Sequence, residues 1–251
     1  QPDTEINTHP GYIKVGPKLL EDHRNYGVLT GIQGADDRSE ALDIFARMYA
    51  PMIGTGPVSD YLSQTGLDAL RGADILSDAP KTYSSSVEYG GSPFAQWMKS
   101  IAQVHLSDFG TRVLYTGVNP GTFDTHANQN GAQGRLLSIY AEGMKALAEE
   151  LQKHGLWQDT LVMTFSEFGR RVAQNGSRGT DHGAASNLYL LGGALKKAGF
   201  YNDGPNLLDL DEGDLKYQMD FRQVYANVLQ HWLGATPDPV IGRKFGSLGI
   251  I

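Results

Sequence analysis

Two short apolar runs separated by one long helix-forming segment constrain the fold of this chain more than any other feature. The runs are Arg112–Val118 and Leu161–Phe165, and their residue types favour strands. Between them, Gly131–His154 repeats apolar side chains at intervals of three and four, which predicts an amphipathic helix followed by Gly155 at its end. A strand–helix–strand crossover joins parallel strands and is almost always right-handed. We therefore expect an α/β fold in which the two strands lie parallel in one sheet.

Further elements are predicted around this unit. Ser92 and Pro93 are typical of a helix start, and the helix is expected to reach about residue 109. Asn187–Leu191 is predicted as a third strand of the same sheet, and Asp220 as the cap of a helix over 220–233. The three helices are expected to cover the sheet, and the apolar, glycine-rich tail is expected to pack back onto it.

The region before Ser92 has a different character. Proline and glycine interrupt residues 1–38, which hold no apolar run of strand length and are predicted to form an extended surface arm. A serine- and glycine-rich loop over 80–91 is the predicted boundary. We therefore expect an N-terminal arm with irregular helical segments over 1–91 and an α/β core over 92–251.

Composition excludes several classes of function. The 251 residues carry a formal net charge of −7 without a basic stripe, which argues against a nucleic-acid-binding protein. No apolar run approaches the roughly 18 residues that a membrane-spanning helix needs. The chain has no cysteine, so disulfides and thiolate metal sites are excluded.

Side chains of the types that can bind metal ions follow both strands of the predicted crossover. Asp124 and His126 lie in the loop after the first strand, and Glu167, Asp181 and His182 follow the second. Because the carboxyl ends of parallel strands meet at one edge of a sheet, we expect these five side chains in one cleft. Carboxylates and imidazoles without thiolates suit Zn²⁺, Mn²⁺ or iron better than Ca²⁺ or Mg²⁺. The sequence therefore predicts a metal site at this edge.

Arg170 and Arg171 follow the same strand and are predicted to hold an anionic substrate, because a guanidinium group matches phosphate or sulfate oxygens in a fork. A structural role for the acidic residues remains open. Asp124 would equally cap a turn before the long helix, and Asp181 with His182 would tie down a loop as a hydrogen-bonded pair. The expected convergence of all these residues on one edge favours the site.

Four segments together resemble a known family. They read FDTHANQ at Phe123–Gln129, TFSEFGRR at Thr164–Arg171, NGSRGTDHGAA at Asn175–Ala185 and MDFRQVYANVLQHWLG at Met219–Gly234. In this order and spacing they resemble the DUF1501 family of bacterial proteins, from about Ser92 to the C-terminus. That family is placed in the alkaline phosphatase/sulfatase-like superfamily. The resemblance implies an α/β sandwich, with a mostly parallel sheet and helices on both faces, in an exported protein that often carries a twin-arginine signal.

The resemblance also implies an activity. Similar superfamily enzymes bind two metal ions through Asp and His residues, and they use a Ser or Thr nucleophile that follows an Asp on the first strand. We therefore expect a hydrolase of small phosphate or sulfate esters that depends on a divalent metal ion, namely Zn, Mn, Ca or Mg.

The chain departs from the family pattern at three points. Residues 1–38 offer no strand that ends in Asp and a nucleophile, so the N-terminal part of the fold is expected to be missing. Glu167-Phe168 stands where the superfamily has an Asp-His pair, and Asp124 and His126 are more closely spaced than the corresponding phosphatase residues. These departures leave the nucleophile unassigned. They favour an alternative function, a non-catalytic binding or assembly module that retains the fold.

The missing strand has a further consequence. An open sheet edge invites pairing with another chain. We expect residues 1–38 to fold back over it, or a second copy or a partner fragment to cover it, with a two-fold homodimer as the commonest solution.

Overall fold

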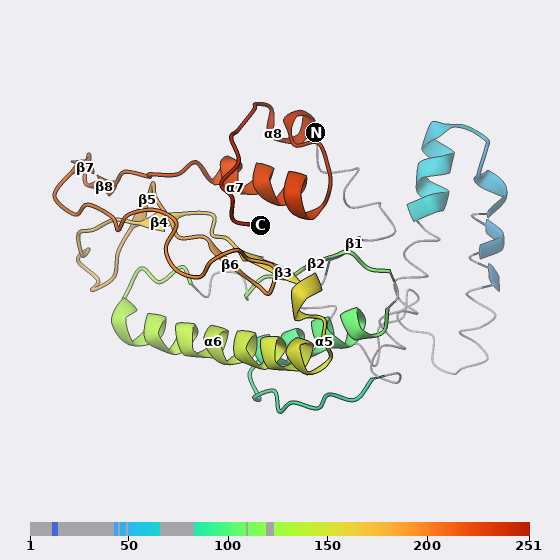
Figure 1. Cartoon of the computed structure of the whole chain (residues 1–251), viewed down its shortest axis with the longest axis horizontal. Helices are drawn as coiled ribbons and strands as arrows, with labels where there is room; N and C mark the ends of the chain where they lie inside the picture. Colours follow the sequence, from blue (N-terminus) through green and yellow to red (C-terminus); the bar gives the residue numbers. More distant parts are fainter. Residues whose placement is uncertain are drawn as a thin grey trace. The chain divides into compact units, whose positions relative to one another are not determined.

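A computed structural model describes residues 12–14, 43–44, 46–48, 50–65, 83–108, 110–118 and 123–251 (Figure 1). The chain divides into two compact units, residues 1–120 with 139–150, and residues 121–138 with 151–251. Both units combine helices with short strands, so the α/β class is correct at this level. The predicted arm over 1–38 lies outside the described residues, except for 12–14.

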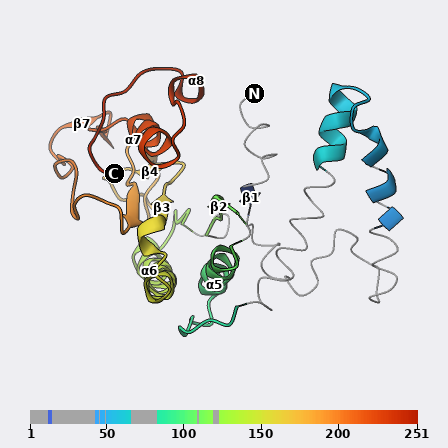
Figure 2. The ribbon, with the colours of Figure 1, turned by 45° about the vertical axis from the view of Figure 1, so that its right-hand side comes forward.

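In the first unit, α5 (Pro93–Leu106) packs against the middle of the long helix α6 (Gln129–Lys153), and Figure 2 shows the two helices side by side. The Ser92 hydroxyl caps α5 by accepting a hydrogen bond from the backbone N–H of Ala95 at 3.2 Å, with proline at the first helical position, as predicted. The buried Phe94 ring lies over Gly143 of α6, where a Cβ atom would be only 2.7 Å from the ring. A glycine at this position therefore lets the two helices approach closely.

A charged side chain is fully buried in this unit. The Glu150 carboxylate, from α6, accepts hydrogen bonds from the hydroxyl groups of Tyr83, Ser85 and Ser86 and from the backbone N–H of Ser86, the last at 3.0 Å. Burial raises the carboxyl pKa, but these hydrogen bonds outweigh burial and lower the pKa of Glu150 to about 2. Glu150 thus fastens the segment before α5 to the long helix.

The described strands form two-stranded ladders. In the first unit β2 (Val113–Tyr115) pairs in parallel with β1 (Tyr12–Lys14). In the second unit β3 (Leu161–Thr164) pairs antiparallel with β6 (Tyr189–Gly192). Because β1 lies along an edge of β2, the N-terminal segment covers that edge over three residues.

The prediction of one sheet containing the strands over 112–118, 161–165 and 187–191 is correct only in part, because β3 and β6 pair as neighbours whereas β2 does not pair with β3 among the described residues. Each run does contain a strand, but in the described part of the chain β2 and β3 belong to different ladders. An apolar run identifies a strand and not its partner, because every strand offers the same backbone N–H and C=O groups. The long connection after β3 folds back on itself, so β6 returns beside β3 in the opposite direction.

Two smaller ladders complete the strands of the second unit. They are β4 (Gly169–Arg170) with β5 (His182–Gly183), and β7 (Leu210–Asp211) with β8 (Asp214–Leu215), both antiparallel. Short helical turns occur at η1 (Ala50–Met52) in the first unit and η2 (Trp157–Asp159) in the second. Of the helices that the structure describes, none has the length and apolar character to cross a membrane.

The C-terminal part of the second unit is helical. Asp220 caps α7 (Phe221–Asn227), which continues into the π-helical turn η3 (Val228–Trp232) and is followed by α8 (Asp238–Ile241). The buried Asn227 amide donates to the Gly246 carbonyl at 3.2 Å and accepts from the backbone N–H of Leu248 at 2.7 Å. The expected packing of the tail against the body is thereby confirmed.

Candidate metal centre

Two segments of the second unit meet at the start of α6. One is the segment that leads into the helix, residues 123–128, and the other runs from β4 to β5. Backbone N–H groups of Asn128 and Gln129 donate to the carbonyls of Ser177 and Arg178, both at 3.0 Å. The Arg170 guanidinium donates to the carbonyl of Thr180 at 2.6 Å and to that of Phe123 at 2.7 Å. These bonds hold the two segments together without a shared sheet.

Asn175 organises the loop between β4 and β5. Its side-chain oxygen accepts from the backbone N–H groups of Ser177 and Gly179 at 2.9 and 3.0 Å. Its amide nitrogen donates to the His126 carbonyl and to Asp181 Oδ1, both at 3.0 Å. Asn175 therefore positions His126 in one segment and Asp181 in the other. The sequence signal for this role is the Asn-Gly dipeptide, which is typical of tight turns.

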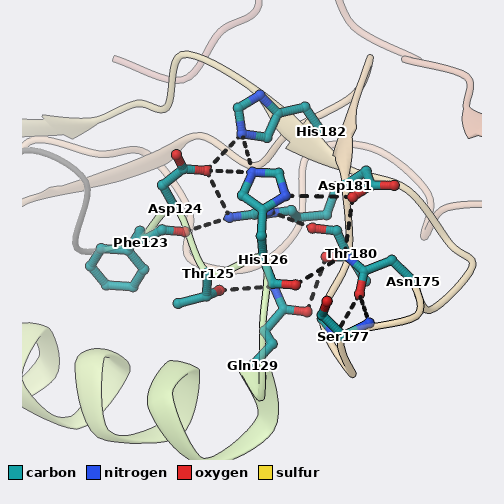
Figure 3. Close-up of polar contacts among 12 residues, drawn as sticks. Phe123, Asp124, Thr125, His126, Gln129, Asn175, Ser177, Thr180, Asp181 and His182 are labelled. Atoms are coloured by element: carbon teal, nitrogen blue, oxygen red, sulfur yellow. Dashed lines mark hydrogen bonds and ion pairs between the residues drawn. The ribbon is translucent and has the colours of Figure 1, made fainter.

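Three side chains converge where the segments meet (Figure 3). Asp124 Oδ1 lies 2.7 Å from His182 Nε2 and 2.9 Å from His126 Nε2, and the two Nε2 atoms are 3.1 Å apart. The side chains are 40%, 45% and 45% exposed for Asp124, His126 and His182. One carboxylate oxygen and two imidazole nitrogens thus form a small triangle that solvent reaches.

Neighbouring groups fix the orientation of both imidazoles. His126 Nδ1 lies 3.5 Å from Asp181 Oδ1, on the side of the ring away from the triangle. The Phe168 ring stacks on the His182 ring, with centroids 3.6 Å apart and an angle of 11°. Carboxylates behind ligating histidines are a recurrent feature of metal sites, since they set the tautomer and the ring orientation.

The groups around the cluster favour the ionised form of two carboxyl groups, those of Asp124 and Asp181. The hydrogen bond with His182 lowers the pKa of Asp124, and the charges of His126, His182 and Arg170 lower it further. The Asp181 pKa is also lowered, first by the hydrogen bond from Asn175 and then by that with His126. Both carboxyl groups therefore stay ionised well into mildly acidic solution, in the form that a cation requires.

The structure places the other predicted site residues differently. Glu167 is exposed and lies outside the Asp124–His126–His182 group. Arg170 donates to backbone carbonyls and lies 3.5 Å from Asp124 Oδ1. Arg171 bonds the Glu212 carbonyl, and its Nε is 3.1 Å from Asp214. Both guanidinium groups thus have protein partners, and a substrate-binding role for either stays a prediction.

Two glycines of the loop provide a test of the scaffold. A Cβ atom on the buried Gly179 would lie 2.3 Å from the backbone of His126, whereas one on Gly176 would meet nothing within 4 Å. Gly179→Ala is therefore expected to lower the free energy of unfolding by about 2 kcal/mol, as overpacking does. The matched control Gly176→Ala should change it by less than about 0.5 kcal/mol. Urea unfolding of both variants measures the difference, and equal values would contradict the packing described for His126.

Fold and site together define a mixed α/β protein with a solvent-accessible Asp–His–His cluster at the start of a long helix. The family model described as "Protein of unknown function (DUF1501)" matches residues 78–240, and the chain belongs to this family. The cluster, its supporting loop and the Glu150 network all fall within the matched residues. The chain matches no curated protein and no solved structure at a significant level.

Proposed function

We propose that Asp124, His126 and His182 bind one divalent transition-metal ion, and that the protein hydrolyses small phosphate or sulfate esters at this centre. The observation that carries the metal site is the convergence of one carboxylate oxygen and two imidazole nitrogens within 3.1 Å of one another. The ester substrate, membership of the alkaline phosphatase/sulfatase-like superfamily and an exported location belong to the proposal through the family resemblance.

The residues fit a small divalent ion. Imidazole nitrogens and a carboxylate oxygen bind Zn²⁺ at about 2.0–2.2 Å, which places ligand atoms of a tetrahedral site roughly 3.3 Å apart. The separations of 2.7, 2.9 and 3.1 Å are slightly shorter, so small side-chain rotations suffice. Two imidazole Nε2 atoms that face the same carboxylate oxygen need either protons or a cation among them. Nitrogen-rich ligation favours zinc over calcium or magnesium.

The chain's own groups would prepare the site for an ester. Asp181 holds the His126 ring through Nδ1, and Phe168 holds the plane of the His182 ring. Arg170 adds positive charge beside Asp124 while it fixes the backbone of Phe123 and Thr180. A bound divalent ion supplies Lewis acidity toward an ester oxygen. The triangle is partly exposed, so a substrate would approach it from the solvent side.

Metal titration tests this proposal directly. Wild-type protein, stripped with EDTA and titrated with Zn²⁺ or Mn²⁺ by calorimetry, is expected to bind one ion per chain. His182→Ala should weaken binding by more than about 100-fold, since loss of a ligand exceeds the 10–100-fold effect of a supporting residue. The matched control is His231→Ala, an exposed histidine of η3 outside the cluster. Chromogenic phosphate and sulfate esters then test hydrolysis by the loaded protein.

A binding or assembly module without catalysis is the second candidate. The observation that favours it is the ligand set, because the described residues contain one such group and Glu167 lies outside it. Superfamily hydrolysis uses two ions, and one three-residue group supplies only part of such a site. Stoichiometric metal binding without turnover of either ester would support this second function and contradict the hydrolase.

A further inference from the structure

A surface pocket lies beside the proposed metal centre and is lined by residues other than those of the cluster. It has a volume of about 310 Å³ and is lined chiefly by polar side chains, those of Gln129, Asn130, Gln133, Gln174, Arg178 and Thr180. We call it the amide pocket. Its described lining includes four amide side chains and one guanidinium group but no carboxylate. Since Thr180 and Thr125 occupy the oxygen and nitrogen of the Gln129 amide, the pocket offers the amides of Asn130, Gln133 and Gln174 together with a single positive charge.

The amide pocket is structurally continuous with the metal centre. The Gln129 side-chain oxygen accepts from the Thr180 hydroxyl, and its nitrogen donates to the Thr125 hydroxyl, both at 3.0 Å. Thr125 in turn donates to the Gln133 side-chain oxygen at 3.3 Å. Thr125 stands between the cluster residues Asp124 and His126 in the chain. These side-chain hydrogen bonds therefore join the wall of the pocket to the residue between two members of the cluster.

Arg178 has a backbone conformation that its residue type disfavours. Its φ is +60°, in the left-handed region where a Cβ atom is crowded. Its backbone N–H donates to the Asn175 carbonyl at 3.2 Å, and its carbonyl accepts from Gln129 at 3.0 Å. A glycine would make the same two bonds without strain. The strained backbone points to a role for the arginine side chain, which lines the pocket and forms no ion pair within the described part of the chain.

We propose that the amide pocket binds a polyhydroxylated monoanion, with its acidic group on Arg178 and its hydroxyl groups on the amides of Asn130, Gln133 and Gln174. A side-chain amide carries both a donor and an acceptor, which matches the two roles of a hydroxyl group. A guanidinium group pairs with a carboxylate, sulfate or phosphate through two parallel hydrogen bonds. As a substrate subsite, the pocket rests on the proposed hydrolase and makes the substrate an ester of such a polyol acid. As a binding site, it stands independently of that activity.

The test uses glucuronate as the probe and the full chain in the presence of EDTA, so that no metal contributes. Saturation-transfer NMR and calorimetry should show saturable binding of glucuronate and weaker binding of glucose, which lacks the charge. Arg178→Gly should weaken glucuronate binding by about 10-fold or more. Its melting temperature should be unchanged or higher, because glycine relieves the strained φ. The matched control Arg135→Ala, an exposed arginine of α6 outside the pocket, should bind as wild type does.

Two results would overturn the pocket assignment. One is the absence of saturable glucuronate binding to the wild type, and the other is equal affinity in Arg178→Gly. His182→Ala separates this proposal from the metal centre, since it should still bind glucuronate while it loses the metal ion. If the wild-type protein binds glucuronate but no metal ion, the proposed hydrolase activity is contradicted and the proposed binding role of the amide pocket is retained.

Discussion

Replacing Glu150 with glutamine is expected to lower the free energy of unfolding by about 3 kcal/mol, because hydrogen bonds to a buried charged group each contribute about 1.5–3 kcal/mol. The Glu150 carboxylate is fully buried and accepts from three hydroxyl groups and one backbone N–H. Glutamine keeps the shape but turns one acceptor oxygen into a donor that faces donors. The exposed neighbour Glu149 is the matched control, since it pairs with Lys145 at 3.6 Å on the helix surface. Glu149→Gln should cost less than about 0.5 kcal/mol.

The effect of Glu150 should depend on pH in a defined direction. Its pKa is lowered from 4.5 to about 2 in the folded chain, so the unfolded state takes up a proton first as the solution is acidified. The contribution of the ionised carboxylate is fully present above pH 4.5 and is lost as the pH falls toward 2. Urea unfolding of wild type and Glu150→Gln between pH 6 and pH 2.5 should show the difference narrowing with acid. A constant difference would mean that the cost is steric and not due to the charge.

Local sequence patterns predicted the elements well and the pairing of the strands only in part. Ser92 before a proline, the three–four periodicity of α6 and the aspartate before α7 each depend on residues close in sequence, and each helix forms as predicted. The pairing of β3 depends instead on how a long loop returns, which no local pattern encodes. The contact of β1 with β2 joins residues about a hundred positions apart. Neither pairing can be recognised from the side-chain pattern of a short strand.

The three cluster residues lie together, but the contacts that bring them together differ from those predicted. Asp124, His126 and His182 were expected to meet because parallel strands end at one sheet edge. They meet because Asn175 and backbone hydrogen bonds fasten the loop after β4 to the start of α6. Glu167 lies outside the Asp124–His126–His182 group, so its role as a ligand stays a prediction. The next residue, Phe168, is the one that stacks on the His182 ring.

Asp124→Asn is expected to abolish saturable metal binding and, with it, any ester hydrolysis. Asp124 Oδ1 is the atom shared by both imidazole nitrogens, at 2.7 and 2.9 Å, and asparagine removes the negative charge that offsets a divalent ion. Asp181→Asn should act more mildly, by about 10–100-fold in metal affinity, because it reaches the site through His126 Nδ1. Glu167→Gln should leave the affinity unchanged, because its carboxylate lies outside the cluster.

The order of these three variants distinguishes the three-residue centre from the five-residue ligand set that the sequence predicts. If all five residues were ligands, Glu167→Gln and Asp181→Asn would weaken binding as strongly as Asp124→Asn. Calorimetric titration with Zn²⁺ gives the three affinities. Unfolding curves of the same proteins control for structural damage, which is expected to be small because Asp124, Glu167 and Asp181 are all exposed. Equal losses of Zn²⁺ affinity in all three variants would mean that Glu167 is a metal ligand. The segment between β3 and β4 would then have to rearrange when the metal binds.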